Sequence, residues 1–194
     1  MESISPVITL STDKKNRALF LDRDGVINKD THFLYKIDEV IFVDGIFDLC
    51  LSAQQRGYII VIITNQSGIA RGYYTEKDYK ILMRWMNVQF VEQGITVTDT
   101  FYCPHHPTSG LRGYKKKCNC RKPSPGMIIS AMNKYNIDLQ ASLFVGDRVS
   151  DMFSAQAACV GQKILFRASN NFDSSDVNIA DKVIDNLTDA IKFL

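Results

Sequence analysis

The feature that most constrains the fold of this chain is an alternation of short apolar runs with segments of helical periodicity. The runs have the length of strands and are mostly rich in β-branched or aromatic residues. Near-continuous apolar strands separated by helices are typical of a parallel sheet that is covered on both faces. We therefore predict an α/β fold with a doubly wound, mostly parallel sheet. The expected strands cover residues 17–22, 58–64, 97–102, 142–147 and 163–167.

Two segments between these runs carry apolar residues at helical spacing, and the second follows the helix-opening sequence SPG. In folds of this kind the ligand site lies outside the carboxyl ends of the strands. Polar residues at those ends are therefore the first candidates for chemistry. The residues at helical spacing are Tyr79, Leu82, Met83, Met86 and Phe90 in the first segment, and Met127, Ile128, Ala131 and Met132 in the second.

The size and composition are those of an ordinary globular protein. The chain has 194 residues, of which 45% are hydrophobic and 23% are charged, and its formal net charge of +2 favours no polyanionic partner. No apolar run approaches the roughly 20 residues of a membrane span, and the N-terminal segment lacks the apolar core of a signal peptide. We expect one domain over residues 1–194, with a leader over 1–16 and a second loose stretch over 170–178. We also expect a cytoplasmic, reducing location, in which clustered cysteines bind metal more often than they form disulfides.

The sequence FLDRDGVIN places two acids at the end of the first expected strand. Asp22 and Asp24 are two positions apart in an extended segment, so both side chains point the same way and Arg23 points elsewhere. Gly25 then lets the chain turn. Asp and Gly are also common in solvated turns, so this motif alone leaves a turn and a catalytic pair as alternatives of similar weight.

Other strand ends supply groups that complement the acid pair. TNQSG offers the Thr64 hydroxyl and backbone N–H groups, and RKPSPG places Lys122 just before a helix. GDRVSD adds Asp147 and Asp151 after a further strand. Two or three acids can hold a hard cation such as Mg²⁺, while Thr, Lys and loop amides can neutralise a phosphoryl group. The set is equipped for phosphoryl transfer to a carboxylate nucleophile.

These four segments, in this order, resemble the haloacid dehalogenase-like (HAD) phosphohydrolases over about residues 18–167. The resemblance implies that Asp22 accepts the phosphoryl group, and that Asp24 protonates the leaving oxygen and then deprotonates the attacking water. It also implies that Thr64 and Lys122 hold the phosphoryl oxygens. Catalytic Mg²⁺ would be bound by Asp22, the carbonyl of Asp24 and Asp147.

Asp151 has two interpretations of equal weight. It can contact water molecules bound to the metal, or it can be an acid at a helix N-terminus, where the helix dipole favours negative charge.

Residues 103–120, CPHHPTSGLRGYKKKCNC, hold three of the five cysteines and two of the three histidines. Three thiolates and one imidazole suit tetrahedral Zn²⁺ and leave no open coordination position, so the metal would be structural. We call residues 103–120 the zinc loop. The expected ligands are Cys103, His105, Cys118 and Cys120.

The competing interpretation of this loop is a set of scattered buried cysteines. We apply that interpretation to Cys50 and Cys159, which fall on expected helices, but the zinc loop is too polar between its cysteines to bury thiols. His106 is an alternative zinc ligand, although the resembling family uses the first histidine of CPHHP.

The motifs FLDRDGVIN, TNQSGIARG and CPHHP…CNCRKPSPG narrow the resemblance to two groups of enzymes. These are the D-glycero-D-manno-heptose-1,7-bisphosphate 7-phosphatases and the related histidinol-phosphate phosphatases that share the zinc loop. Only 41 residues lie between Asp22 and Thr64, and 57 lie between Thr64 and Lys122, which leaves no room for a sizeable cap domain. A capless site leaves substrate specificity to short loops.

The expected substrate-binding residues lie in those loops. By resemblance, several of them contact the sugar phosphate or its distal phosphate, and arginine is a good bidentate partner for phosphate. Arg121 and Arg148 thus favour a substrate with two phosphates, although both can also be solvated surface cations. Position 148 is Arg where the family commonly has Lys. The full expected set is Asp30, Thr31, His32, Phe33, Asn65, Gln66, Ser67, Arg121 and Arg148.

The expected function is Mg²⁺-dependent hydrolysis of a phosphomonoester, with the 7-phosphate of heptose 1,7-bisphosphate as the first choice. Histidinol phosphate or another small sugar phosphate is the alternative substrate. A zinc module that binds nucleic acid is a remote alternative, suggested by RGYKKKCNCRK, but the near-neutral charge and the lack of a recognition helix oppose it. We expect a monomer with a sugar phosphate substrate and neither nucleic acid nor membrane as a partner.

Overall fold

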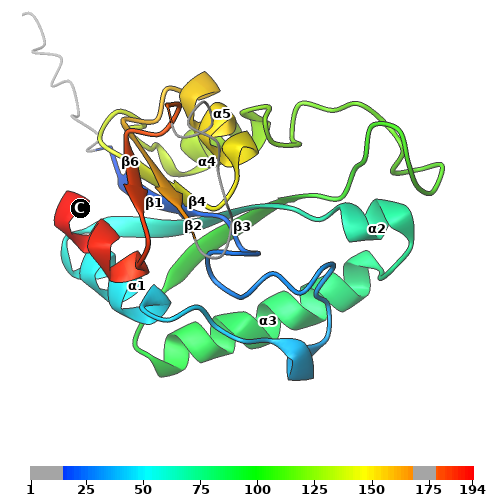
Figure 1. Ribbon diagram of the computed structural model, residues 1–194, viewed down its shortest axis with the longest axis horizontal. Coiled ribbons are helices and arrows are strands. Elements are labelled where there is room, and N and C mark those ends of the chain that lie inside the picture. Colours follow the sequence, from blue (N-terminus) through cyan, green and yellow to red (C-terminus); the bar gives the residue numbers. More distant parts are fainter. Residues whose placement is uncertain (1–14, 168–177) are drawn as a thin grey trace, which may run out of the picture.

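The computed structural model describes residues 15–167 and 178–194. Its six strands form one sheet in the order β3-β2-β1-β4-β5-β6, and every pair is parallel (Figure 1). The predicted doubly wound parallel sheet is therefore confirmed. The strands are β1 (Arg17–Leu21), β2 (Tyr58–Asn65), β3 (Val97–Cys103), β4 (Leu143–Gly146), β5 (Gln162–Phe166) and β6 (Lys182–Ile184).

All five predicted strands are present, and each of their ends lies within one residue of the prediction. The short strand β6 is an addition at the sheet edge. Most of the predicted leader and of the predicted loose stretch at 170–178 lies outside the described residues.

Helices cover both faces of the sheet (Figure 1), with α4 and α5 on one side and α1 and α3 on the other. None of the helices in the described ranges is long and apolar enough to cross a bilayer. The α-helices are α1 (Ile46–Gln55), α2 (Ser67–Arg71), α3 (Glu76–Glu92), α4 (Gly126–Tyr135) and α5 (Val149–Ala157), and the 3₁₀ helices are η1 (Ile37–Glu39) and η2 (Leu187–Phe193).

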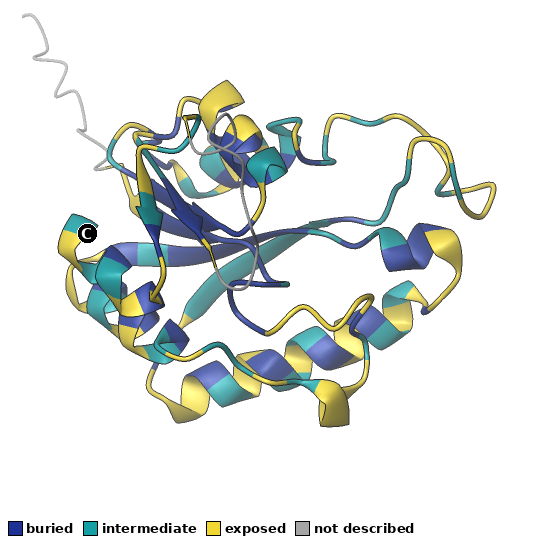
Figure 2. Cartoon of the chain, viewed as in Figure 1, coloured by how far each residue is buried: buried dark blue, intermediate teal, exposed yellow. Residues whose placement is uncertain are grey.

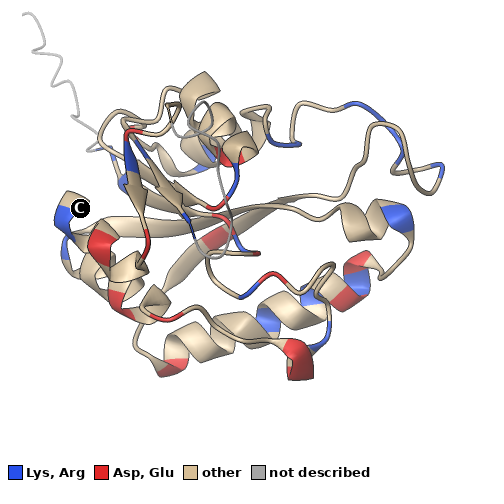
Figure 3. Ribbon diagram, in the orientation of Figure 1, with Lys and Arg blue, Asp and Glu red and all other residues tan. Residues whose placement is uncertain are grey.

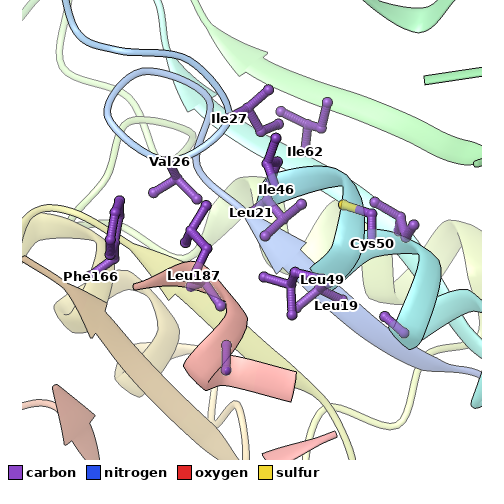
Figure 4. Packing of buried hydrophobic residues seen from close by; sticks show 14 of the residues in the cluster. Leu19, Leu21, Val26, Ile27, Ile46, Leu49, Cys50, Ile62, Phe166 and Leu187 are labelled. Carbon is purple, nitrogen blue, oxygen red and sulfur yellow. The ribbon is translucent and has the colours of Figure 1, made fainter. Parts of the chain in front are cut away.

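The strand β1 divides the core into two layers because its side chains alternate between the faces of the sheet. Leu19 and Leu21 belong to a cluster with residues of α1, α3 and η2, and Figure 4 shows them beside Ile46 and Leu49 of α1 and Leu187 of η2. Ala18 and Phe20 point the other way and pack against α4 and α5. All four are fully buried, and most of the length of the central strands is dark blue in Figure 2. Burial of a large apolar side chain stabilises the fold by about 1.5–3 kcal/mol.

Two details differ from the expectations. The described chain between Thr64 and Lys122 forms α2, α3, β3 and the zinc loop, with no cap, and α2 is a helix that the spacing of apolar residues did not predict. Cys159 is not a buried helical residue: α5 ends at Ala157, and Cys159 is exposed with φ +61°. Cys50 is buried on α1, as expected.

Candidate active site and metal centres

The carboxyl ends of β1, β2 and β4 meet at one edge of the sheet, and acidic and basic segments lie there side by side (Figure 3). Asp22 follows β1, Thr64 is the penultimate residue of β2, and Asp147 follows β4. All three side chains are buried. Because β2, β1 and β4 are neighbours in the sheet, their ends bring together the two acids and the hydroxyl group that the sequence motifs indicated.

Lys122 enters this edge from the end of the zinc loop and is 3% exposed. Its Nζ lies 2.9 Å from Asp22 Oδ1 and 2.8 Å from Asp151 Oδ1, and it donates to the Ile63 carbonyl at 2.8 Å. Asn65 at the end of β2 holds the lysine backbone, since its side chain exchanges two hydrogen bonds of 3.1 Å with Lys122 N and O. The cation is therefore anchored to the sheet although its own segment is irregular.

Three buried acids form what we call the carboxylate cluster: Asp22, Asp147 and Asp151. Their ligand oxygens all lie within 4.8 Å of one another. Burial, followed by the charges of Asp151 and Asp24, raises the pKa of Asp22 to about 7 against the opposing charge of Lys122. Burial and the charges of Asp22 and Asp151 raise the pKa of Asp147 to about 8. Carboxylates packed this closely fit a hard divalent cation, which relieves their mutual repulsion.

Gly25 lets the turn after β1 approach this cluster. Its φ is +90°, and a Cβ atom at this position would collide with the carboxylate of Asp147. Only glycine combines that backbone conformation with that approach.

Asp151 belongs both to the cluster and to the start of α5. Its Oδ2 accepts a hydrogen bond of 3.1 Å from Arg148 N, just before the first turn of α5, while its Oδ1 faces Lys122. The helix-terminal interpretation is therefore observed. A contact with metal-bound water stays a prediction.

Asp24 is held by a different set of partners. Arg23 Nη2 lies 2.7 and 2.8 Å from its two oxygens, and Gln66 Nε2 and Asn28 Nδ2 donate at 3.0 and 3.1 Å. Burial disfavours the charged carboxylate, but Arg23 and the hydrogen bonds outweigh burial and lower the pKa of Asp24. The expectation that Arg23 points elsewhere is wrong for its charged end, because the long side chain folds back onto Asp24.

A cavity of about 410 Å³ opens beside these groups, and loops of the sheet edge line it. Among the nine expected substrate-binding residues, Thr31 does not line it. The eight that do are Asp30, His32, Phe33, Asn65, Gln66, Ser67, Arg121 and Arg148.

Two of these cavity residues are linked across the mouth. Arg148 Nη2 lies 2.6 Å from Asp30 Oδ2, which joins the start of α5 to the loop after β1. His32 and Phe33 adopt φ near +60°, and the His32 side chain is 89% exposed. Short loops and the ends of α2 and α5 thus line the cavity.

Sequence reasoning missed three lining residues: Arg71, Tyr74 and Ser150. Tyr74 donates to Gln66 Oε1 at 2.6 Å and thereby orients the amide that binds Asp24 and Thr64. Arg71 belongs to the motif TNQSGIARG, which was the available signal for it, whereas no pattern in the sequence distinguishes Tyr74, because its position depends on the turn that follows α2.

The zinc loop brings together what we call the cysteine cluster: Cys103, His105, Cys118 and Cys120. The sulfur atoms are 3.1–3.6 Å apart, and His105 Nδ1 lies 3.3 Å from Cys120 Sγ and 3.6 Å from Cys103 Sγ. These separations are too long for a disulfide, whose S–S bond is about 2.0 Å. They are close to the roughly 3.5–3.8 Å edge of a tetrahedron with zinc bonds of about 2.3 Å. The donor set and its spacing therefore fit zinc.

His106 lies outside the cysteine cluster, so the first histidine of the pair is the one that the structure places among the sulfurs. The zinc loop is fastened to its surroundings by Tyr102 and Tyr114, whose hydroxyls both donate to the Glu76 carboxylate. Arg121 Nη1 donates to the carbonyl of His105 at 3.3 Å. The loop therefore connects the cysteine cluster to a residue that lines the cavity.

Comparison with known proteins agrees with this geometry. Residues 22–187 match the family model of polynucleotide kinase 3 phosphatase. The D-glycero-beta-D-manno-heptose-1,7-bisphosphate 7-phosphatase of Yersinia pestis is 41% identical over 175 residues, which are 90% of this chain and 93% of that relative. The D-glycero-alpha-D-manno-heptose-1,7-bisphosphate 7-phosphatase of Burkholderia mallei is 44% identical over 181 residues, 93% of this chain and 94% of that relative.

A solved structure is also similar. The D,D-heptose 1,7-bisphosphate phosphatase from B. bronchiseptica, complexed with magnesium and phosphate, has a TM-score of 0.76 at 29% identity and covers 91% of this chain and 97% of its own. Since the family model and the relatives each span most of the sequence, the chain belongs to the HAD-like phosphatases, in the family of the D-glycero-D-manno-heptose-1,7-bisphosphate 7-phosphatases.

Proposed function

We propose that this phosphatase removes the 7-phosphate of D-glycero-D-manno-heptose 1,7-bisphosphate. One observation carries the proposal: a single cavity joins Asp22 and Lys122 to the cationic side chains of Arg121 and Arg148. A substrate with one phosphate to lose and a second to be recognised uses both parts of such a cavity. The relatives named for this reaction support the same choice.

Two metals complete the proposal. Mg²⁺ would be held by Asp22, the backbone carbonyl of Asp24 and Asp147, and when bound it supplies positive charge that offsets repulsion between the carboxylates and the phosphate. Zn²⁺ would be held by the cysteine cluster, where four protein ligands leave no position for substrate, so its contribution is to the order of the zinc loop.

In the first step the Asp22 carboxylate attacks phosphorus, forming an aspartyl phosphate as the bond from phosphorus to the sugar oxygen breaks. Asp24 gives its proton to that departing oxygen. Lys122 and the Thr64 hydroxyl would hold the phosphoryl oxygens, a role supported by the contact of Lys122 with Asp22 and by the burial of both side chains. The negative charge of the bound phosphate raises the affinity of Asp24 for its proton, against the effect of Arg23.

In the second step the same acid works in reverse. Asp24, now ionised, takes a proton from water, and the water oxygen attacks phosphorus. The bond to Asp22 breaks, which releases inorganic phosphate and restores both carboxyl groups. Arg23 and Gln66 hold Asp24 in one orientation through both steps.

The test is a comparison of kcat/KM, with Mg²⁺ present, for both anomers of heptose 1,7-bisphosphate, histidinol phosphate and fructose 1,6-bisphosphate. We expect one heptose anomer to be preferred over histidinol phosphate by about 100-fold or more, as two charge-assisted contacts to a second phosphate allow. Fructose 1,6-bisphosphate also has a second phosphate, so a preference over it measures recognition of the heptose itself. Equal or higher kcat/KM for histidinol phosphate would reject the proposal.

A further inference from the structure

The zinc loop and α2 meet at an unusual contact between two basic side chains. Arg71, the last residue of α2, places its Nη2 3.0 Å from Nε2 of His106. The two elements are also joined by a hydrogen bond of 2.6 Å from Leu111 N to the Ala70 carbonyl. Arg71 lines the cavity, so the contact lies at its edge.

Both nitrogens of the His106 ring face hydrogen-bond donors. Ser109 N and Thr108 N point at Nδ1 from 3.0 and 3.4 Å, and Arg71 Nη2 lies at Nε2. A neutral imidazole has one acceptor nitrogen, and a guanidinium group has only donors. The ring therefore cannot accept from both sides. When Nδ1 accepts from the backbone and the ring hydrogen is on Nε2, Arg71 and His106 face each other with two hydrogens and no acceptor between them.

The surroundings supply no acceptor either. Among the described residues Arg71 has no carboxylate partner, and its guanidinium carbon lies 5.8 Å from the ring centre of Phe33. Burial lowers the pKa of Arg121, and the charges of Arg71 and Arg148 lower it further against the opposing effect of Cys103 and Cys118. Three arginines thus share the cavity, and only Arg148 has an acidic partner in the part of the chain that the structure describes.

We infer that Arg71 and His106 form an oxyanion-binding pair for the phosphate that is not hydrolysed. The inference rests on the proposed bisphosphate substrate and adds two residues to its recognition. One phosphate oxygen accepts hydrogen bonds from both Arg71 Nη2 and His106 Nε2 and so supplies the acceptor that the pair lacks. In the proposed function the phosphate that reacts is held by Asp22 and Lys122, which form an ion pair with each other.

The experiment compares heptose 1,7-bisphosphate with heptose 7-phosphate as substrates for the full chain. Arg71→Gln should raise KM for the bisphosphate by about 10- to 100-fold with little change in kcat, as expected for loss of a charge-assisted hydrogen bond. KM for the monophosphate should rise far less. Arg84→Gln is the matched control, because Arg84 is an exposed arginine on α3 that does not line this cavity.

Two substitutions of His106 separate recognition from loop support. His106→Asn keeps an acceptor for Ser109 N but has no donor in the place of Nε2, so it should raise KM for the bisphosphate. His106→Gln carries an amide N–H near the position of Nε2 and should restore most of the affinity. Zinc content should equal that of the unmodified protein in both variants, which shows that the neighbouring His105 is undisturbed.

These measurements distinguish a wrong inference from a wrong proposed function. If the unmodified protein does not prefer the bisphosphate over the monophosphate, the proposed substrate is wrong and the inference falls with it. If it does prefer the bisphosphate, but Arg71→Gln raises KM equally for both substrates or for neither, the inference alone is overturned.

Discussion

The carboxylate cluster and the cysteine cluster are both groups of metal-ligating atoms within 4.8 Å of one another, but they are built in opposite ways. The carboxylate cluster consists of two residues that follow strands of the sheet and one in the first turn of α5, and it is buried throughout. The cysteine cluster closes a long loop without helices or strands after β3, and three of its four residues are partly exposed (Figure 2).

The two clusters differ in the contacts that hold their ligand atoms in place without a metal. Lys122 already pairs with two acids of the carboxylate cluster, and the sheet fixes their positions. The cysteine cluster contains no such cation, and burial together with the Cys120 contact raises the pKa of Cys103. We conclude that the catalytic acids are positioned by the fold, whereas the zinc loop depends on its metal for order. The predictions below test that conclusion.

The largest effect should come from Asp22→Asn. Replacing the nucleophile should lower kcat by about 10³-fold or more, because an amide cannot form the aspartyl phosphate. The circular dichroism spectrum should remain that of a folded protein, since the sheet sets the geometry of this site. Retention of a tenth of the original kcat would show that Asp22 is not the nucleophile.

Removal of Mg²⁺ should have the next largest effect. A chelator too weak to compete for thiol-bound zinc should reduce the rate by about 10²-fold or more, and added Mg²⁺ should restore it at once because the acids need no refolding. The zinc content, measured by elemental analysis, should not change. Full turnover with zinc alone would contradict the proposal that catalysis depends on Mg²⁺ at the carboxylate cluster.

Loss of zinc should reduce the rate less than removal of Mg²⁺, and it should act mainly on KM for the bisphosphate. Cys118→Ser should release the metal, because a hydroxyl stays protonated and binds zinc weakly. The zinc loop carries His106 and leads into Arg121, so KM for the bisphosphate should rise by about 10-fold. A generic ester such as p-nitrophenyl phosphate should be affected far less. Equal damage to both substrates would mean that the loop supports the catalytic centre itself.

The smallest effect concerns stability and pH. In the metal-free protein the pKa values of Asp22 and Asp147 are about 7 and 8, above the ordinary 3.8. Between about pH 4 and pH 8 the folded state binds more protons than the unfolded state, so the free energy of unfolding should fall as pH rises. Mg²⁺ binds the ionised acids, so its stabilisation should grow over the same interval.

This pH effect can be measured by thermal unfolding. Saturating Mg²⁺ should raise Tm at pH 8 by at least about 2 °C more than at pH 5. Asp22→Asn removes one of the two titrating groups and should weaken the pH dependence. An equal Mg²⁺ effect at both pH values would contradict the raised pKa values of these acids.

The sheet and the reacting groups were predictable from the sequence because they depend on short-range patterns. Apolar runs indicate the strands, and a parallel topology necessarily brings the polar residues at their carboxyl ends together. The strand β6 has three residues and α2 has five, which is too short for a periodic signal. Cys159 was misplaced because nothing in its apolar surroundings marks the end of α5 two residues earlier.

The supporting contacts were less predictable. Alternation along a strand predicts only the direction of the Arg23 Cβ atom, and it does not show that the six side-chain atoms beyond Cβ fold back to reach Asp24. The position of Arg71 depends on how α2 packs against the zinc loop, which joins residues that are distant in sequence. Long, flexible side chains and contacts between loops are set by tertiary packing, which local patterns do not encode.

The place of β1 in the strand order has a consequence for amide hydrogen exchange. β1 is paired on both sides, with β2 and β4, whereas β3 is an edge strand paired only with β2. Amides of a central strand become exposed only in the largest openings, while those of an edge strand and its adjoining loop exchange through smaller ones. The proposed nucleophile Asp22 therefore follows β1, the strand that should open last, and the zinc loop continues from β3, which should open earlier. Substrate entry and product release can then draw on local motion at the sheet edge while the reacting carboxylates stay in register.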